Sequence, residues 1–146
     1  QAVARDIKDA GADGTRSTRR LLPKARQLLA ASSQAMPTDA LHWDAWLHLE
    51  TQCGGFTEVC ECLRSRLEAG KQHTPWKTEP EALDALSEVA AQLVEKLLES
   101  GERAHLKEAK TTVESLLRDA SEKLAATPGC ESLRMLIARI RRHDDD

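Results

Sequence analysis

The chain has 146 residues, of which 31% are charged and 40% hydrophobic, a length that suits one domain with a buried core. Aromatic residues make up only 3% and tyrosine is absent, which argues against a β-sandwich because strands favour aromatic and β-branched residues. Leucine, alanine, glutamate, arginine and lysine, all good helix formers, dominate instead. The composition therefore predicts an all-α protein.

The net charge of −3 is unevenly distributed along the chain. Residues 1–35 hold seven Lys/Arg against three acids, residues 36–102 hold five against thirteen, and residues 103–143 hold nine against five, before three closing aspartates. An acidic middle between basic ends suggests electrostatic complementarity between segments or with partners. It is not the strongly basic face of an autonomous nucleic-acid-binding domain.

No apolar run approaches the roughly 20 residues that span a bilayer, and no signal-peptide pattern is visible. The chain starts at Gln1, so a removed or missing upstream segment stays open. Its cysteines, Cys53, Cys60, Cys62 and Cys130, are too few and too unevenly placed for a disulfide-rich secreted scaffold. We expect reduced thiols inside the cell, in the cytoplasm or nucleus, or in an organelle after removal of a presequence.

The chain begins with a short arm, residues 1–14, and continues with a basic helix. The turn at residues 11–14 separates them, and Thr15 can cap a helix that extends to about Ala35. Pro23 interrupts that helix, so the helix either begins there or is kinked there. We interpret its basic side chains as a solvated face, with a patch for RNA or an acidic partner as the alternative. They are Arg16, Arg19, Arg20, Lys24 and Arg26. Its helically spaced apolar residues are Leu21, Ala25, Leu28 and Leu29.

Residues 37–70 contain two helical patterns separated by Gly54-Gly55. The first, residues 39–53, is apolar on two sides, which predicts a helix sandwiched between neighbours. The second is expected to end at Gly70, and the short link predicts antiparallel helices. Leu41, Ala45, Trp46, Leu49 and Cys53 share one broad face of the first helix, with Trp43 on a second face. Phe56, Val59, Cys60, Leu63 and Leu67 form the inner stripe of the second.

Trp76 lies in the longest irregular connection, residues 71–80. Two interpretations stay open for this side chain. It either folds back over a hydrophobic seam or stands exposed as an aromatic anchor for a partner.

Three further helices are predicted, over residues 81–100, 102–126 and 131–142. Gly101 marks the end of the first of them. The last helix ends in Arg139, Arg141 and Arg142, which suit a helix C-terminus and are a candidate partner-binding cluster. We expect His143 and the closing aspartates to fray. The expected organisation is an arm (1–14), a single helical domain (15–143) and an acidic tail (144–146).

A weak internal repeat runs through the helical region. Pro37, Pro80 and Pro128 each precede a helix with an early leucine, at separations of 43 and 48 residues. Each interval contains a helix, a glycine-marked turn and a second helix. Periods of this size predict stacked helical hairpins, arranged as a short α-solenoid or an irregular bundle of five or six helices.

The pattern Trp43-x2-Trp46-x3-Glu50, followed by Gly54-Gly55 and a second helix, resembles a half-a-TPR (HAT) repeat. That family has an aromatic pair and a glutamate on its first helix. The upstream segment with Ala25-Arg26, Leu28, Leu29 and Met36-Pro37 looks like the second helix of a preceding unit. Residues 80–143 match only as generic TPR-like hairpins. The resemblance implies a scaffold in RNA-processing assemblies and makes Glu50 a tie between adjacent helices.

One cluster has the chemistry of a zinc site: His48, Cys53, Cys60, Cys62 and His73. Cys60 and Cys62 would point about 200° apart on a helix, which prevents both from gripping one ion. We therefore interpret Cys53 and Cys60 as core thiols. A Cys53–Cys60 disulfide and a metal site are the alternatives, and no cofactor is expected.

No catalytic signature is visible: the sequence lacks G-x-S-x-G, a phosphate loop and H-E-x-x-H. The leading hypothesis is a non-catalytic protein–protein interaction scaffold or subunit of a larger assembly. The first alternative is an RNA-associated helical-repeat module that uses the arginines of residues 16–20 or 139–142. The second is a small enzyme or metal-binding protein.

Overall fold

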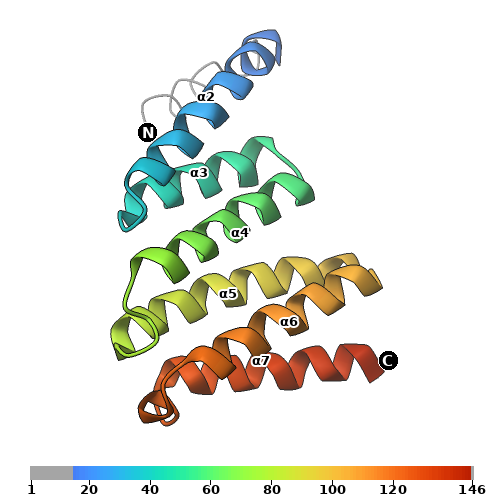
Figure 1. Cartoon of the computed structure of the whole chain (residues 1–146). Coiled ribbons are helices and arrows are strands. Elements are labelled where there is room, and N and C mark those ends of the chain that lie inside the picture. The colour runs from blue at the N-terminus through green and yellow to red at the C-terminus, as the bar shows by residue number, and fades with distance from the viewer. Residues whose placement is uncertain (1–14, 146) are drawn as a thin grey trace. The chain divides into compact units, whose positions relative to one another are not determined.

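The computed structural model describes residues 15–145, and the side chains of residues 21–144 (Figure 1). Within this part of the chain there are six α-helices, one short 3-10 helix and no strand, which confirms the all-α class and the expected number of helices. The residues of the arm, 1–14, lie outside the described part. The elements are α2 (Thr15–Ala35), α3 (Ala40–Cys53), α4 (Phe56–His73), α5 (Pro80–Ser100), α6 (Arg103–Asp119), η2 (Glu122–Leu124) and α7 (Pro128–Asp145).

The chain divides into two compact units, residues 1–62 and residues 63–146, and the division falls inside α4. The segment 15–143, expected to be a single helical domain, spans both units.

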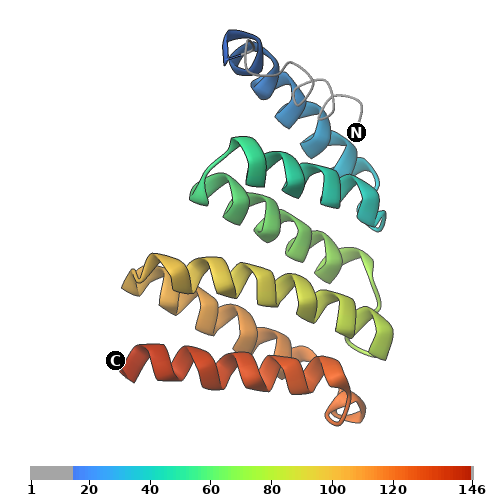
Figure 2. The ribbon, with the colours of Figure 1, turned by 180° about the vertical axis from the view of Figure 1, so that it is seen from behind.

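In the first unit, α2 and α3 form an antiparallel hairpin (Figures 1 and 2). The Asp39 carboxylate caps α3 by accepting a hydrogen bond of 3.0 Å from the backbone N–H of Leu41. Pro23 lies inside α2, so the alternative in which the helix begins at this proline is wrong. The helix continues through Pro23 at the cost of one backbone hydrogen bond, because proline has no N–H.

In the second unit, α5 and α7 run parallel and side by side, and α6 packs against both in the opposite direction (Figures 1 and 2). Each helix turns one apolar face toward the other two. The side chains that are almost fully buried there are Leu83, Ala90, Leu93, Val94, Leu97, Ala109, Val113, Leu116, Leu133 and Ile140. This three-helix core holds the second unit together, since each buried aliphatic side chain contributes about 1.5–3 kcal/mol of transfer free energy.

The expected end of α4 at Gly70 is wrong, because this helix continues to His73. A Cβ atom on Gly70 would lie 2.6 Å from Cδ1 of Leu86 on α5. The glycine therefore permits a close approach of two helices in the second unit and does not terminate one.

The predicted helix over residues 102–126 is shorter in the structure and ends at Asp119. The backbone turns extended at Ala120, and the N–H of Ser121 donates a 2.8 Å hydrogen bond to the carbonyl of Lys77. Leu124, which lies inside the predicted range 102–126, is buried in η2. A tertiary hydrogen bond thus replaces the helical one at this point.

The last helix is longer than predicted, running from Pro128 to Asp145. Proline suits the first turn of a helix, where its missing N–H would have no partner, and Thr127 Oγ1 accepts the N–H of Cys130 at 3.4 Å. His143 and Asp144 belong to the helix, and the fraying of this helix end stays a prediction.

Gly101 ends α5 in the left-handed conformation, with φ of 70°. No atom would approach a Cβ at this position within 4 Å, so a substitution meets backbone strain alone. We expect Gly101→Ala to lower the free energy of unfolding by about 1–2 kcal/mol. Gly101→Asn should lose less, because asparagine tolerates this conformation.

Urea denaturation followed by circular dichroism measures both effects. Gly55→Ala is the control, since Gly55 does not have a positive φ and its added Cβ would have only an ordinary contact of 3.4 Å. Equal stability of the alanine variants at positions 55 and 101 would contradict the role given to Gly101.

Candidate functional site

Glu50 is the one carboxylate buried in the hairpin of α2 and α3, with 1% of its surface exposed. Arg26 of α2 donates two hydrogen bonds to it, from Nε to Oε2 at 2.7 Å and from Nη2 to Oε1 at 2.8 Å. Trp46, one helical turn before Glu50, donates from Nε1 to Oε2 at 3.1 Å. Bidentate arginine–carboxylate pairs are among the stronger hydrogen-bonded contacts in proteins. Both carboxylate oxygens are thus engaged in holding two helices together.

This contact raises the pKa of the Arg26 guanidinium above its usual value, chiefly through the hydrogen bond with Glu50. A folded-state pKa above the unfolded value stabilises the fold at every pH below the usual arginine pKa. The contribution of this charge to stability is therefore constant across neutral pH and is lost only as the pH rises through the arginine range.

Gly54 completes the surroundings of the Glu50 carboxylate. A Cβ atom on this glycine would lie 2.6 Å from Oε1 and 3.0 Å from the carbonyl oxygen of Glu50. Its backbone φ of −101° is open to any residue, so space and not conformation selects glycine here. The close packing of Gly54 against Glu50 thus explains why a glycine stands four residues after this glutamate.

The two tryptophans of α3 are buried and stacked, with ring centroids 5.7 Å apart and planes at 25°. Trp43 Nε1 donates a 3.0 Å hydrogen bond to the carbonyl of Pro37, in the turn that precedes the helix. Both indole N–H groups therefore have partners inside the first unit, as buried tryptophans require.

The cysteines lie mostly in the core. Cys60, Cys62 and Cys130 are buried and Cys53 is half-buried. Cys53 has a free thiol, so the Cys53–Cys60 disulfide does not form. No group of three or more metal-ligating side chains is placed to hold an ion anywhere in the part of the chain that the structure describes.

Trp76 is 2% exposed, which excludes the interpretation of this residue as an exposed anchor. The N–H groups of Thr78 and Glu79 both donate to the carbonyl of Pro75, so Trp76 lies in a tight turn. Its Nε1 donates to the carbonyl of Lys71 at 3.1 Å. The fold-back alternative is the one that the structure adopts.

The two predicted arginine clusters differ in how much of them the structure describes. Arg16, Arg19 and Arg20 lie in α2, but their side chains are outside the described residues. On α7, Arg139 pairs with Glu95 of α5 and Arg142 is exposed. Arg141 lines a surface pocket.

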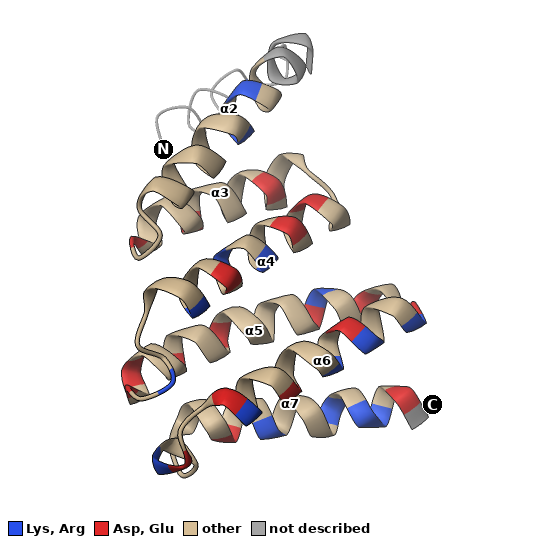
Figure 3. Cartoon of the chain, in the orientation of Figure 1, with Lys and Arg blue, Asp and Glu red and all other residues tan. Residues whose placement is uncertain are grey.

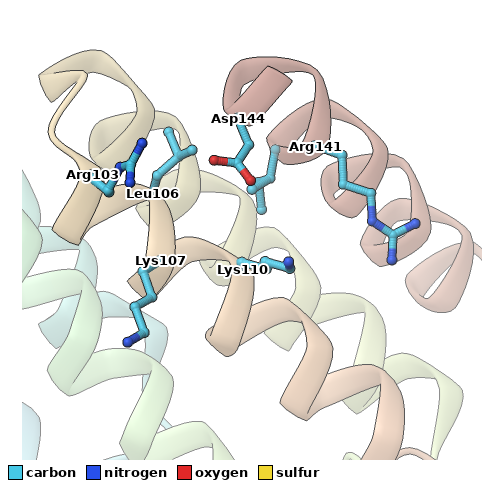
Figure 4. A pocket seen from close by; sticks show the side chains of 7 residues that line it. Arg103, Leu106, Lys107, Lys110, Arg141 and Asp144 are labelled. Carbon is cyan, nitrogen blue, oxygen red and sulfur yellow. The ribbon is translucent and has the colours of Figure 1, made fainter. Parts of the chain in front are cut away.

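That pocket, of about 420 Å³, lies between α6 and α7 in the second unit (Figure 4). Its lining consists of four cationic side chains, one carboxylate and two aliphatic side chains. They are Arg103, Lys107, Lys110, Arg141, Asp144, Leu106 and Ile140. Sequence reasoning named only Arg141 among them and missed the cations of α6, whose spacing of i, i+4 and i+7 places them near one another on a helix.

A second surface feature is apolar and belongs to the hairpin of α2 and α3. Leu28 is 48% exposed and Leu41 63%, although both were expected on packed faces. Leu21 and Met36 are also exposed. Leu21 and Leu28, seven residues apart, share one face of α2, while Met36 and Leu41 flank the turn into α3. We call these four residues the hairpin apolar surface.

Comparisons with protein-family models, with curated protein sequences and with solved structures gave no match. No helix in the described range 15–145 is long and apolar enough to cross a membrane.

Proposed function

We propose that this chain is a non-catalytic interaction scaffold, or a subunit of a larger assembly, built from HAT- or TPR-like helical hairpins. The observation that carries the proposal is the hairpin apolar surface. Single exposed leucines are ordinary on proteins, whereas four exposed large aliphatic or thioether side chains on one hairpin are candidates for burial against a partner.

The contacts of Glu50 support the repeat-like part of the proposal. In the resemblance to a HAT repeat, the aromatic pair and the glutamate lie on the first helix of a unit. Here that glutamate receives Arg26 from the helix before it and Trp46 from its own helix. The glutamate and tryptophan of the motif thus contact other residues inside the hairpin. We propose that partner binding uses the outer surface instead.

Substitution of the hairpin apolar surface tests the proposal. We expect the double variant Leu28→Ser, Leu41→Ser to recover a specific protein partner at least about 10-fold less well than the unchanged chain, since each 1.4 kcal/mol lost at an interface is tenfold in affinity. The measurement is affinity purification with quantitative mass spectrometry, followed by direct binding of the purified partner.

Met135→Ser is the control, because Met135 is 66% exposed but belongs to the other unit. Circular dichroism verifies that both variants fold, as exposed positions change stability by only about 0.5 kcal/mol. Unchanged recovery of every partner by the leucine variant would refute the proposed surface. Recovery of RNA in place of a protein, weakened strongly by salt, would favour the RNA-associated alternative.

A further inference from the structure

The pocket between α6 and α7 brings together cations from two helices. Among the described residues, no ion pair joins Arg103, Lys107, Lys110 or Arg141 to a carboxylate. Other arginines of the same unit are paired. Arg64 lies 2.6 Å from Glu108, Arg134 lies 2.8 Å from Glu131, and Arg139 pairs with Glu95.

The α6 side of the pocket has a regular geometry. Arg103, Leu106 and Lys110 are spaced i, i+3 and i+7 and so lie along one face of the helix, which Figure 4 shows beside α7. The two cations are about 10 Å apart along the helix axis, at 1.5 Å per residue. Leu106 offers an apolar contact between them, and Arg141 adds a cation from the α7 side.

We infer that this pocket binds an acidic helical segment of a partner protein. Carboxylates on a partner helix that are seven residues apart have the same axial spacing as Arg103 and Lys110. An apolar side chain between those carboxylates would meet Leu106. The inference rests on the proposed interaction role, because it specifies the chemistry of a partner.

Two observations favour carboxylates over the phosphates of RNA. Asp144, near the end of α7, already turns its carboxylate toward α6 in the pocket, so a carboxylate carried by a helix fits there (Figure 4). In addition, the lining contains no aromatic side chain on which a base could stack. Asp144 then acts as an internal competitor of the incoming acidic segment.

The distribution of charge over the second unit is consistent with this assignment. Figure 3 shows basic and acidic residues alternating along α6 and several basic residues in the last turns of α7, whereas acidic residues are frequent on α5. Four of the seven residues that line the pocket are cationic and one is acidic. The pocket thus concentrates positive charge in a chain whose net charge is −3. Such local fields steer partners of opposite charge during association.

Fluorescence anisotropy on the purified chain tests the inference. The probe is a labelled helical peptide with glutamates at positions i and i+7 and a leucine at i+3, and the same peptide with glutamines is the negative probe. We expect Arg103→Glu, Lys110→Glu to weaken binding of the acidic peptide by about 10-fold or more. Binding should disappear in about 0.5 M salt, where the Debye length falls below about 5 Å.

The charge-matched control is Lys123→Glu, Arg142→Glu, which changes the net charge equally at exposed positions outside the pocket. It should alter affinity less than about 2-fold. Asp144→Asn should strengthen binding by about 2-fold, whereas Glu88→Gln on α5 should not.

Equal losses in the two double variants, or no binding of the acidic peptide, would overturn the inference. So would tight binding of a labelled oligouridylate that the acidic peptide cannot displace. The two proposals fail separately, because the peptide assay needs only the purified chain. If the acidic peptide does not bind, partner recovery through the hairpin apolar surface can still be observed. If the leucine variant recovers its partners unchanged, binding of the acidic peptide to the pocket can still be observed.

Discussion

Arg26→Ala is expected to lower the free energy of unfolding of the first unit by about 3 kcal/mol. The substitution leaves the Glu50 carboxylate, 1% exposed, with the Trp46 N–H as its remaining side-chain donor among the contacts described. Removal of one partner from a buried ion pair costs about 3–5 kcal/mol, because the other charge stays desolvated. The lower end applies here because the Arg26 side chain is itself 33% exposed.

The second unit contains a matched control for this pair. Arg64 binds Glu108 with the same bidentate geometry, at 2.6 and 2.8 Å, but both side chains are about one-third exposed. Arg64→Ala should therefore cost about 1 kcal/mol or less. The double variant Arg26→Met, Glu50→Met should recover much of the loss, since apolar replacement of both partners removes the buried charge.

Urea denaturation followed by circular dichroism compares these variants. Because two compact units can unfold in separate steps, the transitions must be fitted as two where they do not coincide. Equal destabilisation by the Arg26 and Arg64 substitutions would show that burial of Glu50 does not set the size of the effect.

Trp76→Ala is expected to destabilise the second unit by about 3–5 kcal/mol, the range for removal of a large buried aromatic side chain. The residue is 2% exposed, and its indole N–H donates to the Lys71 carbonyl. Trp76→Phe keeps an aromatic ring but removes the donor, so this variant should lose about 1–3 kcal/mol.

Met135→Ala, at a residue 66% exposed in the same unit, should change stability by no more than about 0.5 kcal/mol. Thermal and urea unfolding measure all three variants. A Trp76→Ala protein with unchanged stability but weaker partner binding would restore the interpretation of Trp76 as an exposed anchor and would refute its structural role.

Helical periodicity predicted the existence of the six helices described in residues 15–145, and most of their boundaries to within a few residues. The largest error, seven residues, is at the end of α6, and the errors at Gly70 and at the start of α7 are three residues each. The errors at Gly70 and at the end of α6 come from tertiary contacts, and the error at the start of α7 comes from local capping. Gly70 accommodates Leu86, Ser121 donates to Lys77, and Thr127 caps α7 beside Pro128. Glycine and proline mark breaks in a sequence, but their neighbours in space decide whether a helix stops.

The candidate surfaces were less predictable than the helices. Leu28 fits the helical spacing of the buried Ala25 and Leu29, yet it lies at the edge of the stripe and is exposed. Trp76 is an aromatic residue in a connection, and sequence alone left its burial open. The pocket of α6 and α7 needed two helices that no sequence pattern pairs, because Arg103 and Arg141 are 38 residues apart.

The sequence by itself determined the all-α class, a count of five or six helices and the Trp43-x2-Trp46-x3-Glu50 spacing, because these follow from local propensity and a 3.6-residue period. Only the tertiary structure decided that Glu50 meets Arg26 in a buried pair and that cations of α6 and α7 line one pocket. Periodicity states which residues share a face of one helix. Burial and charge pairing depend on which other helix covers that face, and long-range packing alone settles this.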